Sequence, residues 1–409
     1  MAGELGPLIA ELDALTARLE AARPFNIGFP GAIDFDYAPL APLFAHQLLN
    51  NVGDPDIDGI AANHTKAMER EVVSFVADLL RAPADDRWGY VTTGASEGTL
   101  YALHLARSLY PGAVIYHSEA AHASVAKAIE LLGMPQVVVC ADEHGELDYD
   151  DLASQIACRR DRPAVVVANI GTTLTEAVDD VRRISAVLDG LAVYRRFVHA
   201  DAALSGIPLA LLDPSQRPGF DFADGADSLI VSGHKFIGSP MPCGVVVVKA
   251  SHRSRLAPSL AYTGSPDVTI TGLRSGHAAL VLWYALRRFG IEGLRTRAEQ
   301  CRELAAYTHG RLVGIGWSAH RHEHAFTVVL KTPPAPVTDR WVLASHGEAS
   351  HIVCMPGITR KQIDAFVTDL SAAICATPPT ATTNNNRRSG LLRRTRPTAP
   401  PVAMTGDTR

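Results

Sequence analysis

Lys235 has the sequence setting of a reactive amine. It follows the apolar run Ser228–Val231, within the segment SGHKF (232–236). Such a run predicts a strand, so the amine would stand at the carboxyl edge of a sheet, where α/β proteins bind their ligands. An amine shielded from water there loses its proton more readily and can attack a carbonyl carbon. On this segment alone, an ordinary loop is an equal alternative.

Asp201 ends an earlier apolar run, in the segment FVHADAA (197–203). A carboxylate at the end of a buried strand is costly unless it faces a partner. The natural partner is a cation at the same edge of the sheet. Taken alone, Asp201 could equally be a structural acid or a helix cap.

The segment TTGASEG (92–98) follows a predicted strand and opens a predicted helix. The free N–H groups at a helix start attract anions, and small residues such as Ala95 and Ser96 allow close approach. The segment lacks the GxxxxGK[ST] pattern, so it does not predict a nucleotide P-loop. His122 follows the next predicted strand and adds an aromatic ring. An ordinary capped helix and a structural histidine are the alternatives.

Together these features predict a site for pyridoxal phosphate. A phosphorylated pyridine aldehyde needs an anion cradle, a stacking surface, an acid for its ring nitrogen and an amine for its aldehyde. The sequence offers them in order: the helix start, His122, Asp201 and Lys235.

The elements that must position these residues alternate along the chain from about residue 88. Most apolar runs are apolar throughout, which is typical of strands covered on both faces. The alternation with helical patterns predicts an α/β fold whose mainly parallel sheet has seven strands. The expected strands are Trp88–Thr92, Ala113–His117, Gln136–Cys140, Ala164–Ile170, Phe197–Ala200, Ser228–Val231 and Val245–Lys249. The expected helices between them are Glu97–Tyr110, Ser124–Leu132, Asp148–Cys158 and Val178–Leu188.

The chain is expected to divide into four parts. Residues 1–50 form an N-terminal helical segment, and residues 51–285 form the large domain that binds the cofactor. Residues 286–376 form a small α+β domain, with a helix at Gly293–Arg311, a strand at Phe326–Lys331 and a helix at Thr359–Ile374. Residues 377–409 are rich in Pro, Thr, Asn and Arg, which predicts a disordered tail.

Composition excludes several classes of protein. The 409 residues are 47% apolar and 20% charged, which is enough for a large core. The net charge of −5 does not suggest a nucleic-acid partner. The six cysteines are scattered without a CxxC pair, so neither a disulfide framework nor a cysteine-rich zinc site is expected. The sequence has no run of eighteen apolar residues, so no membrane span and a cytoplasmic location are expected.

Six long segments carry a resemblance to a known family: NNVGDP (50–55), WGYVTTGASEGTLYALHLAR (88–107), IGTTLTEAVDD (170–180), HADAALSG (199–206), SGHKFIGSPMPCGVV (232–246) and GHAALVLWYALR (276–287). Through them the sequence resembles the group II pyridoxal-phosphate-dependent amino-acid decarboxylases, which have fold type I. The resemblance is greatest to the branch that contains bacterial histidine decarboxylases and plant serine decarboxylases. It covers roughly residues 45–375.

The resemblance implies a role for each matching residue. Lys235 would attach covalently to the cofactor aldehyde, and Asp201 would face the pyridine nitrogen. His122 would stack on the ring, and Ala203 would pack against its opposite face. Thr172 would lie near the ring substituents. The residues that would hold the phosphate are Ala95, Ser96, Ser232 and His234.

Two further features concern the substrate side. Tyr262, in the segment SLAYTGSPD (259–267), is the expected donor of a proton to Cα, with His122 as the alternative. The sequence departs from the family pattern at Glu176, where relatives usually carry Gly, and at Ser275, where they usually carry Asn.

The reaction that the resemblance implies is loss of CO2 from an L-amino acid to give the amine. L-Histidine is the expected substrate, and serine or a small branched amino acid such as valine is the alternative. A homodimer, or a homotetramer, is expected because related enzymes build the site between two subunits. No membrane partner is expected.

Two other interpretations stay open at this point. An aminotransferase or a carbon–sulfur lyase would use the same cofactor, and Arg274 could bind the substrate carboxylate in such an enzyme. The segment HRHEH (320–324) could place three histidines on one side of an extended chain and bind a metal. A polar edge or loop is the simpler interpretation of that segment.

Overall fold

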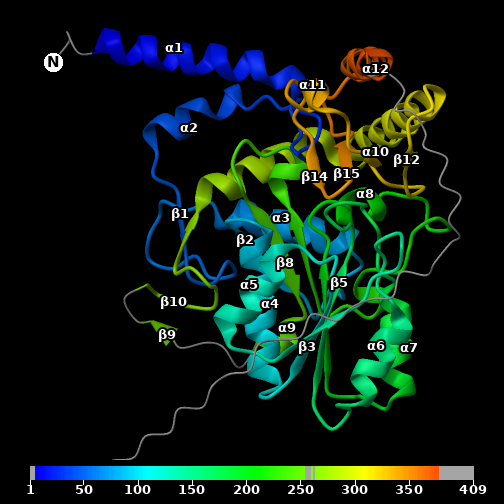
Figure 1. The fold of residues 1–409 in the computed structure, drawn as a ribbon. Helices are drawn as coiled ribbons and strands as arrows, with labels where there is room; N and C mark the ends of the chain where they lie inside the picture. Colours follow the sequence, from blue (N-terminus) through cyan, green and yellow to red (C-terminus); the bar gives the residue numbers. More distant parts are fainter. Residues whose placement is uncertain (1–4, 254–258, 261–262, 377–409) are drawn as a thin grey trace, which may run out of the picture.

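The computed structural model describes residues 5–253, 259–260 and 263–376. Its centre is a seven-stranded sheet (Figure 1) with the order β2-β8-β7-β6-β5-β3-β4. Strand β8 is antiparallel to both of its neighbours, and all other neighbouring strands are parallel. The strands are β2 (Trp88–Thr92), β3 (Val114–Ser118), β4 (Gln136–Val139), β5 (Ala164–Asn169), β6 (Arg196–Asp201), β7 (Ser228–Ser232) and β8 (Gly244–Val248). The predicted α/β fold is confirmed, and each predicted strand ends within about one residue of an observed end.

Helices cover this sheet on both faces, which explains its apolar strands. In β5, Val165 and Val167 pack into the core on one face, while Val166 and Ala168 pack into the core on the other. Successive side chains of a strand point to opposite faces, so a strand buried on both sides must be apolar throughout. The covering helices are α4 (Ala95–Leu109) and α5 (Ala123–Leu132) on the first face, and α3 (Lys66–Leu79), α6 (Tyr149–Ala157) and α7 (Val181–Gly190) on the second.

Helix capping corrects one predicted boundary. The helix expected from Val178 begins at Val181, because the Asp180 side chain accepts the N–H groups of Arg182 at 2.8 Å and Arg183 at 3.4 Å. A carboxylate in this position satisfies donors that have no partner inside the helix. The residues before Val181 are therefore available to line the sheet edge.

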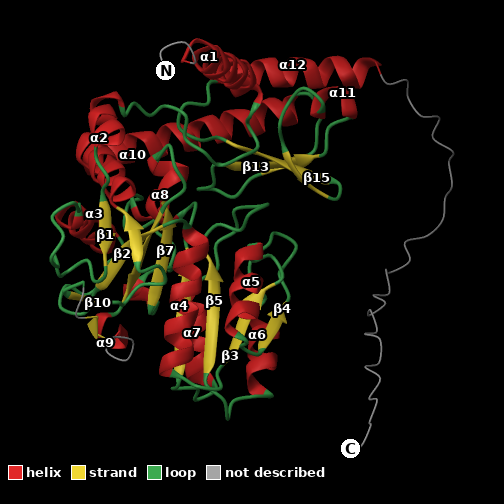
Figure 2. Cartoon of the chain, turned by 90° about the vertical axis from the view of Figure 1, so that its left-hand side faces the viewer, coloured by secondary structure: helices red, strands yellow, loops and turns green. Residues whose placement is uncertain are grey.

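A second, antiparallel sheet lies beyond the edge at which β5 ends (Figure 2). Its order is β12-β13-β15-β14, and only β13 was predicted. The long helix α10 (Gly276–Gly314) crosses the predicted domain boundary and is interrupted at Gly290, where φ is 60°. The division of the chain at residue 286 stays a prediction. The other elements here are β12 (Ala319–His320), β13 (Thr327–Lys331), α11 (Ala335–Thr338), β14 (Ala344–His346), β15 (Ala349–Val353) and α12 (Arg360–Ala376).

The N-terminal part is only partly helical. Between α1 (Leu5–Ala22) and α2 (Ala41–His46), the chain is largely extended. It contacts the part of the chain that follows each sheet: the Ala32 N–H donates to Lys235 O, after β7, and the Ile33 N–H donates to Pro356 O, after β15. The remaining elements are the 3-10 turns Arg23–Phe25, Ala38–Leu40 and Phe222–Asp224, with β1 (Asn50–Val52), α8 (Gly206–Ala210), α9 (Ala250–Arg253), β9 (Ser259–Leu260), β10 (Ser265–Pro266) and β11 (Leu273–Ser275). Within the three described ranges, no helix combines the length and apolar character needed to cross a membrane.

Candidate active site

A cavity of about 440 Å³ opens where β5, β6 and β7 end and α4 begins. Segments far apart in the sequence meet there, because the carboxyl ends of parallel strands share one edge of the sheet. Nine of the predicted site residues line it: Ala95, Ser96, His122, Thr172, Asp201, Ala203, Ser232, His234 and Lys235. The tenth, Tyr262, lies outside the described residues, as does the predicted tail 377–409.

Lys235 lies in a single π-helical turn, Gly233–Ile237, directly after β7. Its backbone angles, φ −83° and ψ −107°, are not helical. Burial lowers the pKa of its amine, and the negative charges of Asp201 and Glu176 partly oppose that shift. A lowered lysine pKa increases the fraction of neutral amine, which is the nucleophilic form.

Asp201 is the last residue of β6, and its side chain is largely buried beside the cavity. In the sheet register it stands opposite Asn169, the last residue of β5. Two residues earlier, His199 is fully buried, with Nδ1 at 2.8 Å from the Ser228 hydroxyl and Nε2 at 3.4 Å from the Thr99 hydroxyl. Burial lowers the pKa of His199 to about 4, so this ring is neutral.

Another part of the cavity lining, formed by the start of α4 and by Ser232, is suited to a phosphate. Helix α4 begins at Ala95 after Gly94, so its first N–H groups point toward the cavity rim without partners inside the helix. The Ser232 hydroxyl is buried and has no hydrogen-bond partner among the described residues. A buried orphan hydroxyl is costly unless a ligand satisfies it. The donors present therefore fit the phosphate group of the expected cofactor.

His122 caps helix α5. Its Nδ1 accepts the Ser124 N–H at 3.1 Å and contacts the Ser124 hydroxyl at 2.7 Å. Because Nδ1 acts as an acceptor, the proton of the neutral ring resides on Nε2. Thr172 is used locally as well: its hydroxyl accepts the Ala177 N–H at 3.0 Å and lies 2.8 Å from the Thr175 hydroxyl.

Sequence reasoning missed several parts of the cavity wall, among them Phe29–Pro30, Asn169 and His351. Asn169 could have been found, since it is a polar residue at the end of a predicted strand. The Asn169 amide is held by Asp179, whose carboxylate accepts its Nδ2–H at 3.0 Å. His351 and Phe29–Pro30 come from distant parts of the chain, and no local pattern marks them.

Arg274 and Ser275 have structural partners away from the cavity lining. Arg274 is almost fully buried and forms an ion pair with Glu69 at 3.0 Å. The Ser275 hydroxyl caps α10 by accepting the Ala278 N–H at 3.2 Å. Among the described residues, Lys235 is the only lysine or arginine that lines the cavity. Arg274 is thus not placed to bind a substrate carboxylate there.

The histidines of the segment 320–324 lie at the edge of the small sheet. His320 ends the short strand β12, and its ring lies 5.2 Å from those of His144 and His322. Across the part of the chain that the structure describes, no three His, Cys, Asp or Glu side chains could hold a metal ion.

Several known proteins that this chain resembles are decarboxylases. Residues 35–316 match the family described as "Pyridoxal-dependent decarboxylase conserved domain". The chain is 45% identical over 361 residues to a histidine decarboxylase of Mesorhizobium japonicum, covering 88% of this chain and 97% of that protein. It is 38% identical over 350 residues to a histidine decarboxylase of Acinetobacter baumannii, covering 85% and 90%. The structure of L-methionine decarboxylase from Streptomyces sp. 590 superimposes with a TM-score of 0.81 at 26% identity, covering 89% and 94%.

Proposed function

Because the chain belongs to the pyridoxal-dependent decarboxylases, and is therefore a carboxy-lyase whose cofactor is pyridoxal phosphate, we propose that it converts L-histidine to histamine and CO2. The observation that carries this substrate is the 45% identity to a histidine decarboxylase along almost the whole of that protein. The identity to the methionine enzyme is much lower, at 26%.

In the proposed mechanism, pyridoxal phosphate supplies the electron sink that takes up the bonding electrons when CO2 leaves. Lys235 would offer the amine that attaches to the cofactor aldehyde, and burial lowers the pKa of this amine, which favours its neutral, nucleophilic form. The Asp201 carboxylate holds a proton on the pyridine nitrogen, because an adjacent negative charge favours the protonated form. The α4 N-terminus and the Ser232 hydroxyl bind the phosphate.

The other lining residues orient the substrate and move one proton. His122 would stack on the cofactor ring, and Ala203 would pack against the opposite face of that ring. Tyr262 protonates Cα after CO2 has left. If a Tyr262→Phe variant keeps its turnover, the donor is Nε2 of His122, which carries the ring proton.

The substrate is tested by incubating the purified enzyme, supplemented with pyridoxal phosphate, with L-histidine, L-serine, L-valine and L-methionine separately. Histamine should form with the highest kcat/KM, and the matched Lys235→Ala variant should form none. Faster release of a different amine would overturn the assignment of histidine and keep the enzyme class. A 2-oxo acid as the main product would contradict the reaction itself.

We further propose that the enzyme is a homodimer joined in part through α1. This helix buries none of its residues, and six large apolar side chains on it are exposed: Leu5, Leu8, Ile9, Leu12, Leu15 and Leu19. Apolar faces of this kind mark protein interfaces. Light scattering after gel filtration should give twice the chain mass, and a Leu12→Glu, Leu15→Glu variant should shift it toward one chain. The expected cytoplasmic location stays a prediction, which cell fractionation would test.

A further inference from the structure

The turn that carries Lys235 obtains hydrogen-bond donors from outside itself. The last carbonyl groups of a helix lack partners inside that helix and need other donors. Two donors come from the extended N-terminal segment: the Ala32 N–H donates to Lys235 O at 3.2 Å, and the Tyr37 hydroxyl donates to Gly238 O at 3.0 Å. The four consecutive carbonyls of residues 235–238 are therefore held at their first and last members by one extended segment, which lies about 200 residues away in the sequence.

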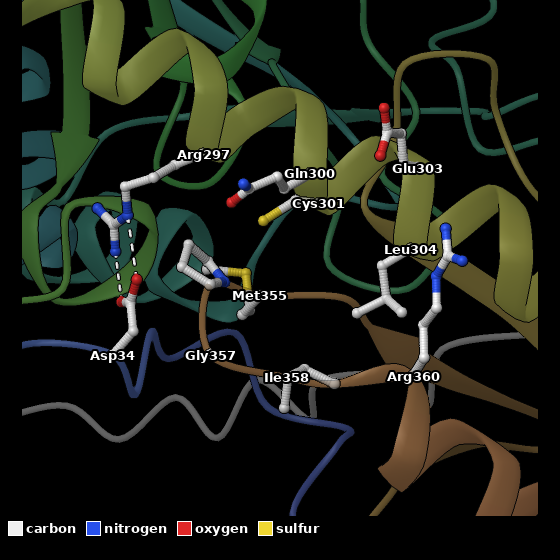
Figure 3. Close-up of a pocket in the computed structure, with 11 residues that line it drawn as sticks. Asp34, Arg297, Gln300, Cys301, Glu303, Leu304, Met355, Gly357, Ile358 and Arg360 are labelled. Atoms are coloured by element: carbon white, nitrogen blue, oxygen red, sulfur yellow. Dashed lines mark hydrogen bonds and ion pairs between the residues drawn. The ribbon is translucent and has the colours of Figure 1, made fainter.

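Arg297 of α10 supplies the donors for the two carbonyls in between. Its Nη1 donates to Phe236 O at 3.2 Å and to Ile237 O at 3.3 Å. The other side of the same guanidinium faces Asp34, with Nη2 at 2.5 Å from Oδ1 and Nε at 3.3 Å from Oδ2. Figure 3 shows the two side chains pointing toward each other beside a small pocket next to α10. Asp34 thus fixes the orientation in which Arg297 reaches the lysine turn.

The Arg297 side chain is restricted to one conformation by its surroundings. It is 7% exposed, and its guanidinium carbon lies 4.2 Å from the centre of the Phe289 ring. An arginine fork that is both paired with a carboxylate and stacked on an aromatic ring is held in one geometry. The carbonyls that it binds belong to the two residues immediately after Lys235.

We propose that the Asp34–Arg297 pair positions Lys235 for its bond to the cofactor. The backbone angles of Lys235 are not helical, and the Gly238 and Ser239 N–H groups that close the turn donate to Gly233 O rather than to Lys235. The external donors therefore determine where the Lys235 side chain points, because they fix Lys235 O and the peptide groups that follow. A misplacement of about 1 Å at a reacting group can lower a rate about 100-fold. The inference rests on the covalent role proposed above for Lys235.

Three variants of the holoenzyme test this proposal. Asp34→Asn removes the charge that holds Arg297, and Tyr37→Phe removes a single donor with little effect on packing. The matched control is Asp364→Asn, which breaks a similar ion pair between α10 and α12, that of Arg311 with Asp364, far from the lysine turn. For each variant we would measure kcat, KM, the pH dependence of the cofactor's visible absorption band and hydrogen exchange of peptide 233–239.

Asp34→Asn should lower kcat about 10- to 100-fold with little change in KM, and should shift the pH midpoint of the absorption band. Tyr37→Phe should lower kcat several-fold, by about the effect of one hydrogen bond. Both should speed exchange in peptide 233–239, and Asp364→Asn should change none of these quantities. If all three variants behave alike, or if the band of Asp34→Asn titrates as in the wild type, the positioning role is wrong. If Lys235→Ala keeps the wild-type band, the proposed role of Lys235 itself fails, which is a different result.

Discussion

Glu176 binds Thr327 twice through one carboxylate oxygen. Oε2 accepts the Thr327 N–H at 2.8 Å and the Thr327 hydroxyl at 2.5 Å. The same oxygen accepts the Phe326 N–H at 3.0 Å, and Oε1 accepts the Ser205 hydroxyl at 2.9 Å. These bonds join the loop after β5 to the start of β13. One buried carboxylate therefore connects the large sheet to the small one.

The Glu176→Gln variant should be less stable by about 2 kcal/mol, because a neutral amide oxygen accepts the three donors that bind Oε2 more weakly than a carboxylate does, and the amide NH2 replaces the acceptor of the Ser205 hydroxyl. Glu176→Gly would relieve the left-handed backbone, where φ is 58°, but would lose all four hydrogen bonds, so it should also be destabilised. Urea unfolding at a fixed cofactor concentration measures both effects. The exposed Glu143→Gln serves as the control. Equal stability of Glu176→Gln and the wild type would contradict a stabilising role for the Glu176 carboxylate between the two sheets.

Asp201→Asn should lower kcat by about 100-fold while the enzyme keeps its cofactor, because the neutral amide no longer favours the protonated pyridine nitrogen. The amide has nearly the same shape, so the cavity should keep its form and KM should change little. Stopped-flow kinetics with the proposed substrate and the absorption spectrum of the bound cofactor provide the measurements. Near-normal turnover would show that the carboxylate has another role.

The sequence was sufficient for the parts of the site that depend on local patterns. Asp201 ends one apolar run and Lys235 closely follows another, and parallel strands bring such ends together whatever the loops between them. The seven-stranded sheet was predicted for the same reason. The substrate of a decarboxylase is not encoded in such patterns.

The parts that could not be predicted depend on contacts between distant segments. The extended stretch between α1 and α2 was expected to be helical, yet Ala32 bonds to Lys235 O and Asp34 to Arg297. His351 reaches the cavity only because β15 packs beyond the edge of the large sheet. Nothing near these residues in the sequence specifies their partners, so tertiary packing alone decides their place.

His351 connects two walls of the cavity. Its Nε2 lies 2.9 Å from Gly28 O, and its Nδ1 lies 3.1 Å from Leu174 O. His351→Ala removes both contacts, and the carbonyl that receives the single N–H of the neutral ring loses its donor, so we expect KM to rise about tenfold, with a smaller change in kcat. The exposed His346→Ala on neighbouring β14 is the matched control. An unchanged KM in His351→Ala would show that these contacts do not shape the substrate end.

His199 should make the enzyme sensitive to acid. Its pKa is about 4 in the folded protein, because burial disfavours the charged ring, against 6.5 for an ordinary histidine. The folded state therefore binds fewer protons than the unfolded state between these values. The stabilisation is fully present above about pH 6.5 and is lost as the pH falls toward about 4. At about 1.4 kcal/mol per pH unit, the loss between about pH 7 and pH 5 is about 2 kcal/mol.

The measurement is urea unfolding at both pH values, with the cofactor concentration fixed. His199→Gln is less stable at neutral pH, because it changes the buried contacts to Ser228 and Thr99. It cannot gain a proton, however, so its loss of stability on acidification should be smaller than that of the wild type by about 2 kcal/mol. The exposed His346→Gln should keep the wild-type slope. Parallel slopes for His199→Gln and the wild type would mean that His199 is not the group whose protonation unfolds the enzyme.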